Sequence, residues 1–186
     1  MPHVTFVIPT IGRPTLIKTI ESVDNIVQPV KEWTCDSLVV FDGIEPTVPK
    51  SIQIEKSGES NHAGRVRNAG IKHATSEWIG FVDDDDILHP GYLKALSDCP
   101  TDEVDVIIFR MVYARDSLVL PPPGAQDFRK CEVGISFCVR RSCFVDDGIW
   151  FEPSDVEDFT LLDTLRSKGK RIYMSEAVVY MVRPWE

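Results

Sequence analysis

The sequence predicts an α/β fold with a mostly parallel central sheet, and three observations lead to it. Up to residue 98, short β-branched runs alternate with segments of helical apolar spacing. Proline, glycine or aspartate ends most of the apolar runs, as is typical of buried strands. At 186 residues and 43% hydrophobic, the chain can bury one sizeable core. We therefore predict a single domain over 1–186, with an alternating half over 1–98 and a mixed half over 99–186.

The first half opens with a predicted strand–helix–strand unit. Leu16, Ile20 and Val23 recur at helical spacing between two β-branched runs, and Pro14 suits the first turn of a helix. The same reasoning extends to the end of this half. The predicted strands are 3–10, 36–43, 50–56 and 77–83, and the predicted helices are 13–23, 62–75 and 91–98.

The second half changes character, because strand-like runs predominate over helical ones. Strands are predicted over 103–115 and 135–141, with a loop between them, and one or two more strands over 171–184. The segment 156–169 is amphipathic, and Gly169 lies just beyond its basic end, which is typical of a helix C-terminus. We expect strands mixed with a helix here.

Charge and composition exclude several classes of protein. A net charge of −9 argues against a nucleic-acid partner, which requires a basic surface. No apolar stretch approaches the roughly 20 residues of a membrane span, and the N-terminus lacks the pattern of a signal peptide. The five cysteines are scattered and contain no CxxC pair, so we expect reduced, mostly buried thiols in a cytoplasmic protein. Nothing in the sequence indicates the oligomeric state.

The stretch FVDDDDILHP places four carboxylates, Asp83 to Asp86, directly after an apolar run. Carboxylates this close repel one another unless a positive charge lies among them. A divalent cation supplies that charge, and oxygen ligands on a turn suit Mg²⁺ or Mn²⁺, which use one or two carboxylates and leave room for a phosphate. The spacing does not match an EF-hand loop. The sequence therefore predicts a Mg²⁺ or Mn²⁺ site here.

Two further features fit a phosphate-bearing ligand. Asp42 also ends an apolar run, so a parallel sheet would bring it to the same crevice as Asp83. Neither GxGxxG nor the P-loop pattern occurs, which leaves a metal-bridged diphosphate with its nucleoside held by Asp42 and the 62–70 segment. Arg65 and Arg67 are either solvated helix residues or a local positive charge beside that site.

A second acidic group lies in SDVEDF. Ser154 and Glu157 have the spacing of a capping box, and acidic residues suit the first turn of a helix, so these two need no chemical role. Asp158 is not explained in this way. A carboxylate opposite a metal–phosphate cluster would serve as the general base for a hydroxyl. Trp150 and Phe151, just before that helix, offer either a platform for a sugar ring or core packing.

Together these segments resemble family 2 glycosyltransferases with the GT-A fold. VTFVIPTIGRPTLIKTIESV, LVVFDG, GRVRNAGIKHATSEWIGFVDDDD and VEDFTLLDTL occur in that family's order and span nearly the whole chain. The resemblance implies a GT-A-type nucleotide-binding α/β sandwich, with 1–98 as the nucleotide-sugar half and 99–186 as the acceptor half. It implies these roles: Asp42 and Arg67 hold the base, Asp83 and Asp85 meet ribose and metal, Pro9 and Thr10 border the nucleotide, Arg183 closes over the donor, and Asp158 is the catalytic base.

The chain departs from the family pattern at several positions. The chain reads Phe41-Asp42-Gly43-Ile44, without the second aspartate usual at this strand end. Val66 replaces an alanine, and Pro184 and Trp185 stand where a histidine often follows the C-terminal arginine. These departures put a histidine metal ligand and the C-terminal closure in question.

The resulting hypothesis is a metal-dependent, inverting transfer of a sugar from a nucleoside diphosphate donor to a hydroxyl of a glycan or glycoconjugate. Asp85, with Asp83 or Asp84, would hold Mn²⁺ or Mg²⁺ against the phosphates. A UDP-sugar is the commonest donor in the resembling family. The alternatives are a nucleotidyltransferase, a metal-independent glycosidase and a non-catalytic nucleotide-sugar-binding module. The sequence does not identify the sugar, the base or the acceptor.

Overall fold

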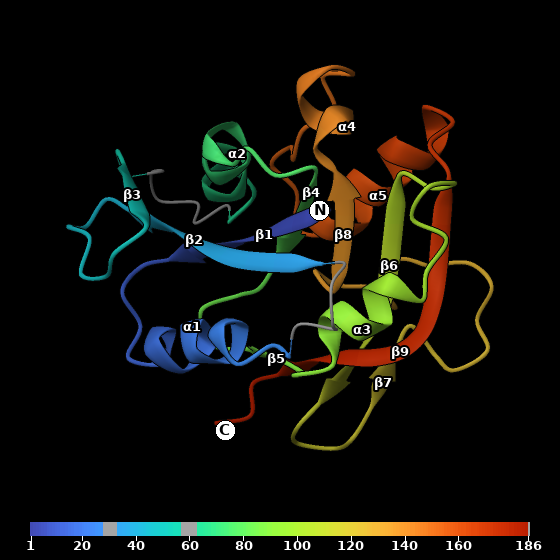
Figure 1. The fold of residues 1–186 in the computed structure, drawn as a ribbon, viewed down its shortest axis with the longest axis horizontal. Coiled ribbons are helices and arrows are strands. Elements are labelled where there is room, and N and C mark those ends of the chain that lie inside the picture. The colour runs from blue at the N-terminus through green and yellow to red at the C-terminus, as the bar shows by residue number, and fades with distance from the viewer. Residues whose placement is uncertain (28–32, 57–62, 186) are drawn as a thin grey trace.

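The fold is built around one continuous, twisted β-sheet (Figure 1). The computed structural model describes residues 1–27, 33–56 and 63–185. Across the sheet the strands follow in the order β3 (Ser51–Ile54), β2 (Thr34–Asp42), β1 (His3–Thr10), β4 (Trp78–Phe81), β8 (Phe137–Arg140), β6 (Val106–Tyr113), β9 (Ile172–Val182) and β5 (Ile87–Leu88), and β7 (Val119–Leu120) pairs with β6.

Strand directions bring several carboxyl ends to one edge of the sheet. β1 is parallel to β2 and β4, and β2 is parallel to β3. β8 is antiparallel to both β4 and β6, so β6 runs in the same direction as β4, and β9 is parallel to β6. The α/β prediction is therefore confirmed, with a parallel first half and a mixed second half. The carboxyl ends of β1, β2, β4, β6 and β9 all lie along the same edge.

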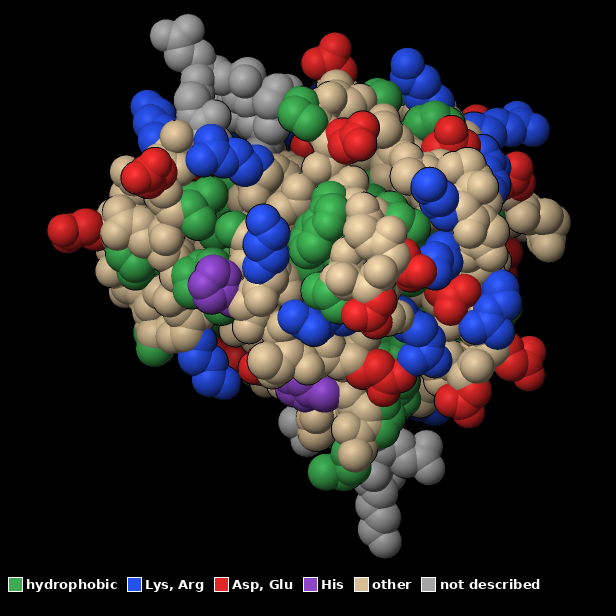
Figure 2. Space-filling model, turned by 90° about the horizontal axis from the view of Figure 1, so that it is seen from above, with side chains coloured by type: hydrophobic (Ala, Val, Ile, Leu, Met, Phe, Trp, Pro, Cys, Tyr) green, Lys and Arg blue, Asp and Glu red, His purple; other side chains and the backbone are tan. Residues whose placement is uncertain are grey.

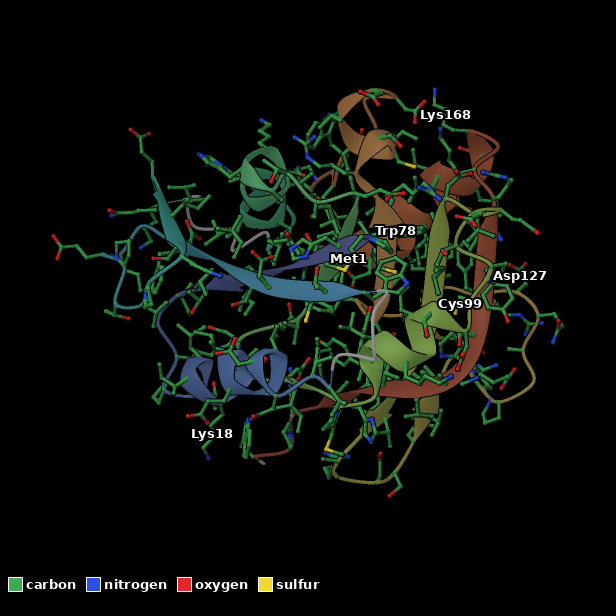
Figure 3. All side chains as sticks on the ribbon, viewed as in Figure 1. Met1, Lys18, Trp78, Cys99, Asp127 and Lys168 are labelled. Atoms are coloured by element: carbon green, nitrogen blue, oxygen red, sulfur yellow. The ribbon has the colours of Figure 1, made fainter. Side chains whose placement is uncertain are left out.

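Helices cover both faces of the sheet (Figure 1). They are α1 (Leu16–Asp24), α2 (Ala63–His73), α3 (Tyr92–Ser97), α4 (Arg141–Val145) and α5 (Glu157–Ser167). Adjacent β1 side chains point to opposite faces. The ring of Phe6 packs edge-on against Tyr92 of α3, with centroids 4.9 Å apart, whereas Val7 faces Gly70 of α2. The sheet is thus buried between two helical layers, and Trp78 of β4 lies fully inside (Figure 3).

Most predicted elements are present with boundaries within a few residues. The region 171–184 forms one long strand, and Pro14 lies in a turn just before α1. His62, the predicted start of the second helix, lies outside the described residues. The sequence analysis did not predict β5, β7 or α4. β7 lies within the segment predicted as a loop. β5 and β7 have two residues each, so only their pairing with β9 and β6 defines them.

The remaining sequence expectations concern the surface and the thiols. None of the helices in the described part of the chain is both long and apolar enough to span a bilayer. Cys99, Cys138 and Cys143 are buried free thiols, and Cys131 is exposed. On the face seen in Figure 2, acidic and basic side chains are interspersed, so that face carries no extended basic surface.

Gly70 tests the packing of α2 on the sheet. A Cβ at this position would overlap Val7 Cγ1 and lie 3.0 Å from Val40 Cγ2. Overpacking typically costs about 1–3 kcal/mol, against a gain of at most about 1 kcal/mol in helix propensity. Gly70→Ala should therefore lower the free energy of unfolding, measured by urea denaturation. Arg65→Ala, at an exposed position of α2, is the control and should change it by less than about 0.5 kcal/mol. A stabilised Gly70→Ala variant would contradict this packing.

Candidate functional site

A pocket of about 240 Å³ lies at the edge where the carboxyl ends of β1, β2 and β4 meet. This is the position where open α/β sheets bind ligands. Most of the predicted site residues share it: the lining is Pro9, Thr10, Ile11, Arg13, Asp42, Ala63, Val66, Asp83, Asp84, Asp85 and Arg183. Arg67 and Asp158, the other two predicted residues, are not part of this lining.

Arginine supplies positive charge to the acidic run, which sequence reasoning did not foresee. Arg13 Nη1 lies 3.0 Å from Asp84 Oδ1 and 2.9 Å from Asp85 Oδ2. Arg183 Nε lies 3.9 Å from Asp85 Oδ2. The protein itself therefore relieves part of the repulsion among the aspartates. For this reason the repulsion supports a metal site less strongly than the sequence suggested. Arg13 lies between β1 and α1, although the sequence predicted it at the start of the helix 13–23.

The four aspartates fall into two kinds. Asp84 is buried, accepts a 2.6 Å hydrogen bond from Thr10 Oγ1 and contacts Arg13; burial raises its pKa, although both partners oppose the shift. Asp86 is also buried, and burial raises its pKa to about 7. The side chains of Asp83 and Asp85 remain 35% and 26% exposed and line the pocket. Asp83 and Asp85 are thus the aspartates best placed for a ligand.

Asp86 connects the acidic turn to the C-terminal strand. Its carboxylate accepts hydrogen bonds from the Tyr180 hydroxyl and from the Arg183 backbone N–H, each of 2.7 Å. The Tyr180 oxygen in turn accepts a hydrogen bond from the Asp83 N–H at 3.1 Å. These bonds hold the end of β9 against the turn, which places Arg183 at the pocket.

Arg67 is buried and surrounded by carboxylates, so it is not a solvated helix residue. Only 3% of its side chain is exposed. Its Nη2 lies 2.6 Å from Asp83 Oδ1, while Nη1 pairs with Glu157 and lies 3.6 Å from Asp158 Oδ1. Burial alone would lower the pKa of Arg67, but the three carboxylates raise it above its ordinary value. The resemblance implies that Arg67 holds the nucleotide base. Because the guanidinium contacts carboxylates in this structure, that role remains a prediction.

The capping-box prediction for Ser154 and Glu157 is wrong. Helix α5 has Val156 as its N-cap, without a side-chain capping bond, and Ser154 Oγ accepts a hydrogen bond from the Val156 N–H. Glu157 instead accepts a 2.9 Å bond from the Gly64 N–H and pairs with Arg67. A Cβ on Gly64 would approach Glu157 Oε2 to 2.7 Å, so glycine permits this contact. A local pattern could not reveal a partner 93 residues away.

Asp158, at the start of α5, has the features of a general base. Its Oδ1 atom is buried and has no hydrogen-bond partner among the described residues. Burial raises its pKa to about 7, opposed by the charge of Arg67. A carboxyl group with a pKa near neutrality can both accept and release a proton efficiently at physiological pH. Phe151, by contrast, is buried and packs edge-on against Phe81, which favours core packing over a sugar platform.

The residues present fit a small divalent cation only in part. No group of three or more His, Cys, Asp or Glu side chains in the described part of the chain is arranged to hold a metal ion. Asp83 and Asp85, however, offer two accessible carboxylates in one pocket. That number is sufficient where water and substrate phosphates complete the coordination of Mg²⁺.

Comparison with known sequences identifies a family. The sequence model described as "Glycosyl transferase family 2" matches residues 5–129, which is more than half of the chain. Asp158 and Arg183 lie beyond the matched region. A 50-residue segment is 40% identical to "Putative glycosyltransferase EpsH" of Bacillus subtilis, a match that covers 27% of this chain and 14% of EpsH.

Solved structures share the fold. Residues 1–349 of S. aureus TarS superpose with a TM-score of 0.72 and 20% identity over 98% of this chain. The same protein in complex with UDP-GlcNAc gives 0.73 and 19%. Mannosyltransferase PcManGT from Pyrobaculum calidifontis, in complex with GDP-Man and Mn²⁺, gives 0.70 and 16% over 98% of this chain. Our chain spans 60%, 58% and 57% of these three chains, respectively.

Replacing Arg67 tests the charge network. Arg67→Gln would leave Asp83, Glu157 and Asp158 close together without their cation. Breaking a buried ion pair in this way typically costs about 3–5 kcal/mol. We expect a loss of that size in the free energy of unfolding at pH 8, measured with urea, and a smaller loss at pH 5. The difference arises because Arg67 opposes the raised pKa of Asp158, so without Arg67 this carboxyl group takes up a proton at the lower pH and the repulsion falls.

The control is Arg65→Gln, which removes an exposed arginine one half-turn away on α2. It should change stability by less than about 0.5 kcal/mol at either pH. If the Arg67→Gln loss were the same at pH 5 and pH 8, packing rather than charge would account for it.

Proposed function

We propose, because this chain belongs to glycosyl transferase family 2, that it transfers a sugar from a nucleoside diphosphate donor to an acceptor hydroxyl with inversion at the anomeric carbon. The observation that carries the proposal is the position of Asp158. This carboxyl group, with a pKa of about 7, is linked through Arg67 to Asp83 at the pocket. A proton acceptor would thereby be held near a site suited to a diphosphate.

The donor would occupy the pocket at the sheet edge. The base and ribose would contact Asp42, Pro9 and the loop after β1, and Arg67 would support this end of the site through Asp83. TarS has been crystallised with UDP-GlcNAc and PcManGT with GDP-Man. Both ligands are nucleoside diphosphate sugars, so a donor of this class, and a UDP-sugar first, is our proposal for this chain.

The diphosphate would lie over the acidic turn. Asp83 and Asp85 would hold Mn²⁺ or Mg²⁺ there, and the bound cation would neutralise charge that develops on the departing diphosphate. Support comes from the oxygen-rich pocket and from Mn²⁺ in the PcManGT complex. Arg13 and Arg183, which line the same pocket, would supply further positive charge to phosphate oxygens. Asp84, whose carboxylate already contacts Thr10 and Arg13, would hold the turn in place.

Asp158 would remove the proton from the acceptor hydroxyl as its oxygen attacks the anomeric carbon. Attack from the face opposite the diphosphate gives inversion. Such general-base assistance typically contributes about 10²–10⁴-fold to the rate. The acceptor would be a hydroxyl of a glycan or glycoconjugate. Family membership favours sugar transfer over nucleotidyl transfer, and a non-catalytic module would bind the donor without turnover.

Asp158→Asn tests the proposed base. We expect the unmodified chain, given UDP-GlcNAc or GDP-Man with Mn²⁺, to hydrolyse the donor slowly and to transfer the sugar faster when a suitable acceptor is present. The release of UDP or GDP measures the rate of both reactions. The variant should lose about 10²–10⁴-fold in that rate, while UDP affinity measured by calorimetry stays within about threefold. Because the base must be deprotonated, the unmodified rate should rise with pH through about 7 and then level off.

The matched control is Asp163→Asn, an exposed carboxylate on the same helix, which should leave the rate unchanged. Retention of the rate in Asp158→Asn would refute the base assignment. Donor binding without turnover under every condition would instead support a binding module, and release of pyrophosphate from a nucleoside triphosphate would support a nucleotidyltransferase.

A further inference from the structure

A second hollow of about 270 Å³ adjoins the donor pocket, and no role has yet been assigned to it. Its lining includes Tyr113 at the end of β6, Arg115 and Leu118 in the β6–β7 turn, and Val182 at the end of β9. Arg183 lines both this hollow and the donor pocket. We propose that this hollow, hereafter the β6 hollow, binds one hydroxyl-bearing sugar ring of the acceptor glycan. The inference rests on the proposed function and extends it to the acceptor.

The topology places the β6 hollow on the functional edge of the sheet. β6 and β9 run in the same direction as the strands that carry the donor pocket. Tyr113 and Val182 are partners in register at the ends of these two strands, and the Ala114 N–H donates to the Val182 carbonyl at 3.1 Å. The β6 hollow therefore continues the line of strand ends along which α/β sheets bind ligands.

Arg183 joins the β6 hollow to the charged groups of the donor pocket. Burial raises the pKa of Tyr113, and the negative charges of Asp86 and Asp158 add to this shift while Arg183 opposes it. Arg183 Nε lies 3.9 Å from Asp85 Oδ2 in the donor pocket, and Arg183 also lines the β6 hollow. An acceptor ring on Tyr113 would thus lie beside the donor pocket, as a transfer requires.

The lining suits a sugar ring. Tyr113 is half-buried and combines an apolar ring with a hydroxyl, and Leu118 is 49% exposed. Arg115 is exposed and can donate hydrogen bonds to sugar hydroxyls. Apolar walls with a few polar groups are typical of small-ligand sites, and this volume is just below the range of about 300–1,000 Å³ for drug-sized ligands. The size and lining favour one ring over an extended lipid chain.

The turn that supplies Arg115 and Leu118 is ordered by its own hydrogen bonds. The Tyr113 N–H donates to the Leu118 carbonyl and the Ser117 N–H to the Tyr113 carbonyl, both at 2.9 Å, and the Leu118 N–H donates to Asp116 Oδ1 at 3.1 Å. A binding-site wall that is already ordered lowers the conformational entropy lost when a ligand binds. The β6–β7 turn is therefore the segment whose residues would select the acceptor.

Binding can be tested without turnover, with simple glycosides as probes. The methyl glycosides of glucose, N-acetylglucosamine and mannose would be followed by saturation-transfer NMR, with UDP and Mg²⁺ present. We expect a signal with the unmodified chain for at least one glycoside. Tyr113→Ala and Leu118→Ala should each reduce it at least fivefold, while Tyr113→Phe, which keeps the ring, should retain most of it. UDP affinity, measured in parallel, reports whether each variant is folded.

The matched control is Tyr173→Ala, because Tyr173 is an exposed tyrosine at the opposite end of β9 (38% exposed), and this variant should behave as the unmodified chain. No glycoside signal with the unmodified chain, or a signal that survives in Leu118→Ala, would overturn the proposal. Failure of the proposed function is distinct: it would appear as an absence of UDP binding or of donor turnover, even where glycosides bind the β6 hollow.

Discussion

The site depends on one buried cation, the guanidinium of Arg67, and on the carboxylates around it. Its contacts join the end of β4, through Asp83, to the start of α5, through Glu157 and Asp158. A buried charge is tolerated only when paired and hydrogen-bonded, so these elements must come together for Arg67 to be buried at all. The same interaction places a pocket aspartate at Nη2 and the proposed base near Nη1 of one guanidinium.

The acidic run divides its work between structure and ligand. Asp84 and Asp86 are buried and hydrogen-bonded, and they fix the loop after β1 and the end of β9. Asp83 and Asp85 remain accessible in the pocket. Arg13 offsets part of the negative charge of Asp84 and Asp85. A phosphate entering this pocket would therefore meet fixed positive charges as well as carboxylates.

The positions of the strand ends were sufficient to predict the sheet edge and to bring Asp42 and Asp83 together, because alternating strands and helices imply parallel strands whose carboxyl ends share one edge. Such reasoning failed where a tertiary partner decides the outcome. Glu157 fits a local capping pattern, yet its partners are Gly64 and Arg67 on another helix. For Arg67 in RVRN the sequence left open a solvated position and a positive charge beside the site, because its carboxylate partners Asp83, Glu157 and Asp158 are distant in sequence. The two-residue strands β5 and β7 exist only through pairing.

The proposed function requires the accessible pair Asp83 and Asp85 to bind a divalent cation together with a nucleoside diphosphate. Electron paramagnetic resonance of Mn²⁺ measures this directly, since protein-bound Mn²⁺ loses the signal of the free ion. Titration with UDP, and separately with GDP, should draw about one Mn²⁺ per chain out of the free pool, and a variant carrying both Asp83→Asn and Asp85→Asn should not. Equal Mn²⁺ binding by that variant, or none by the unmodified chain with either nucleotide, would contradict the account.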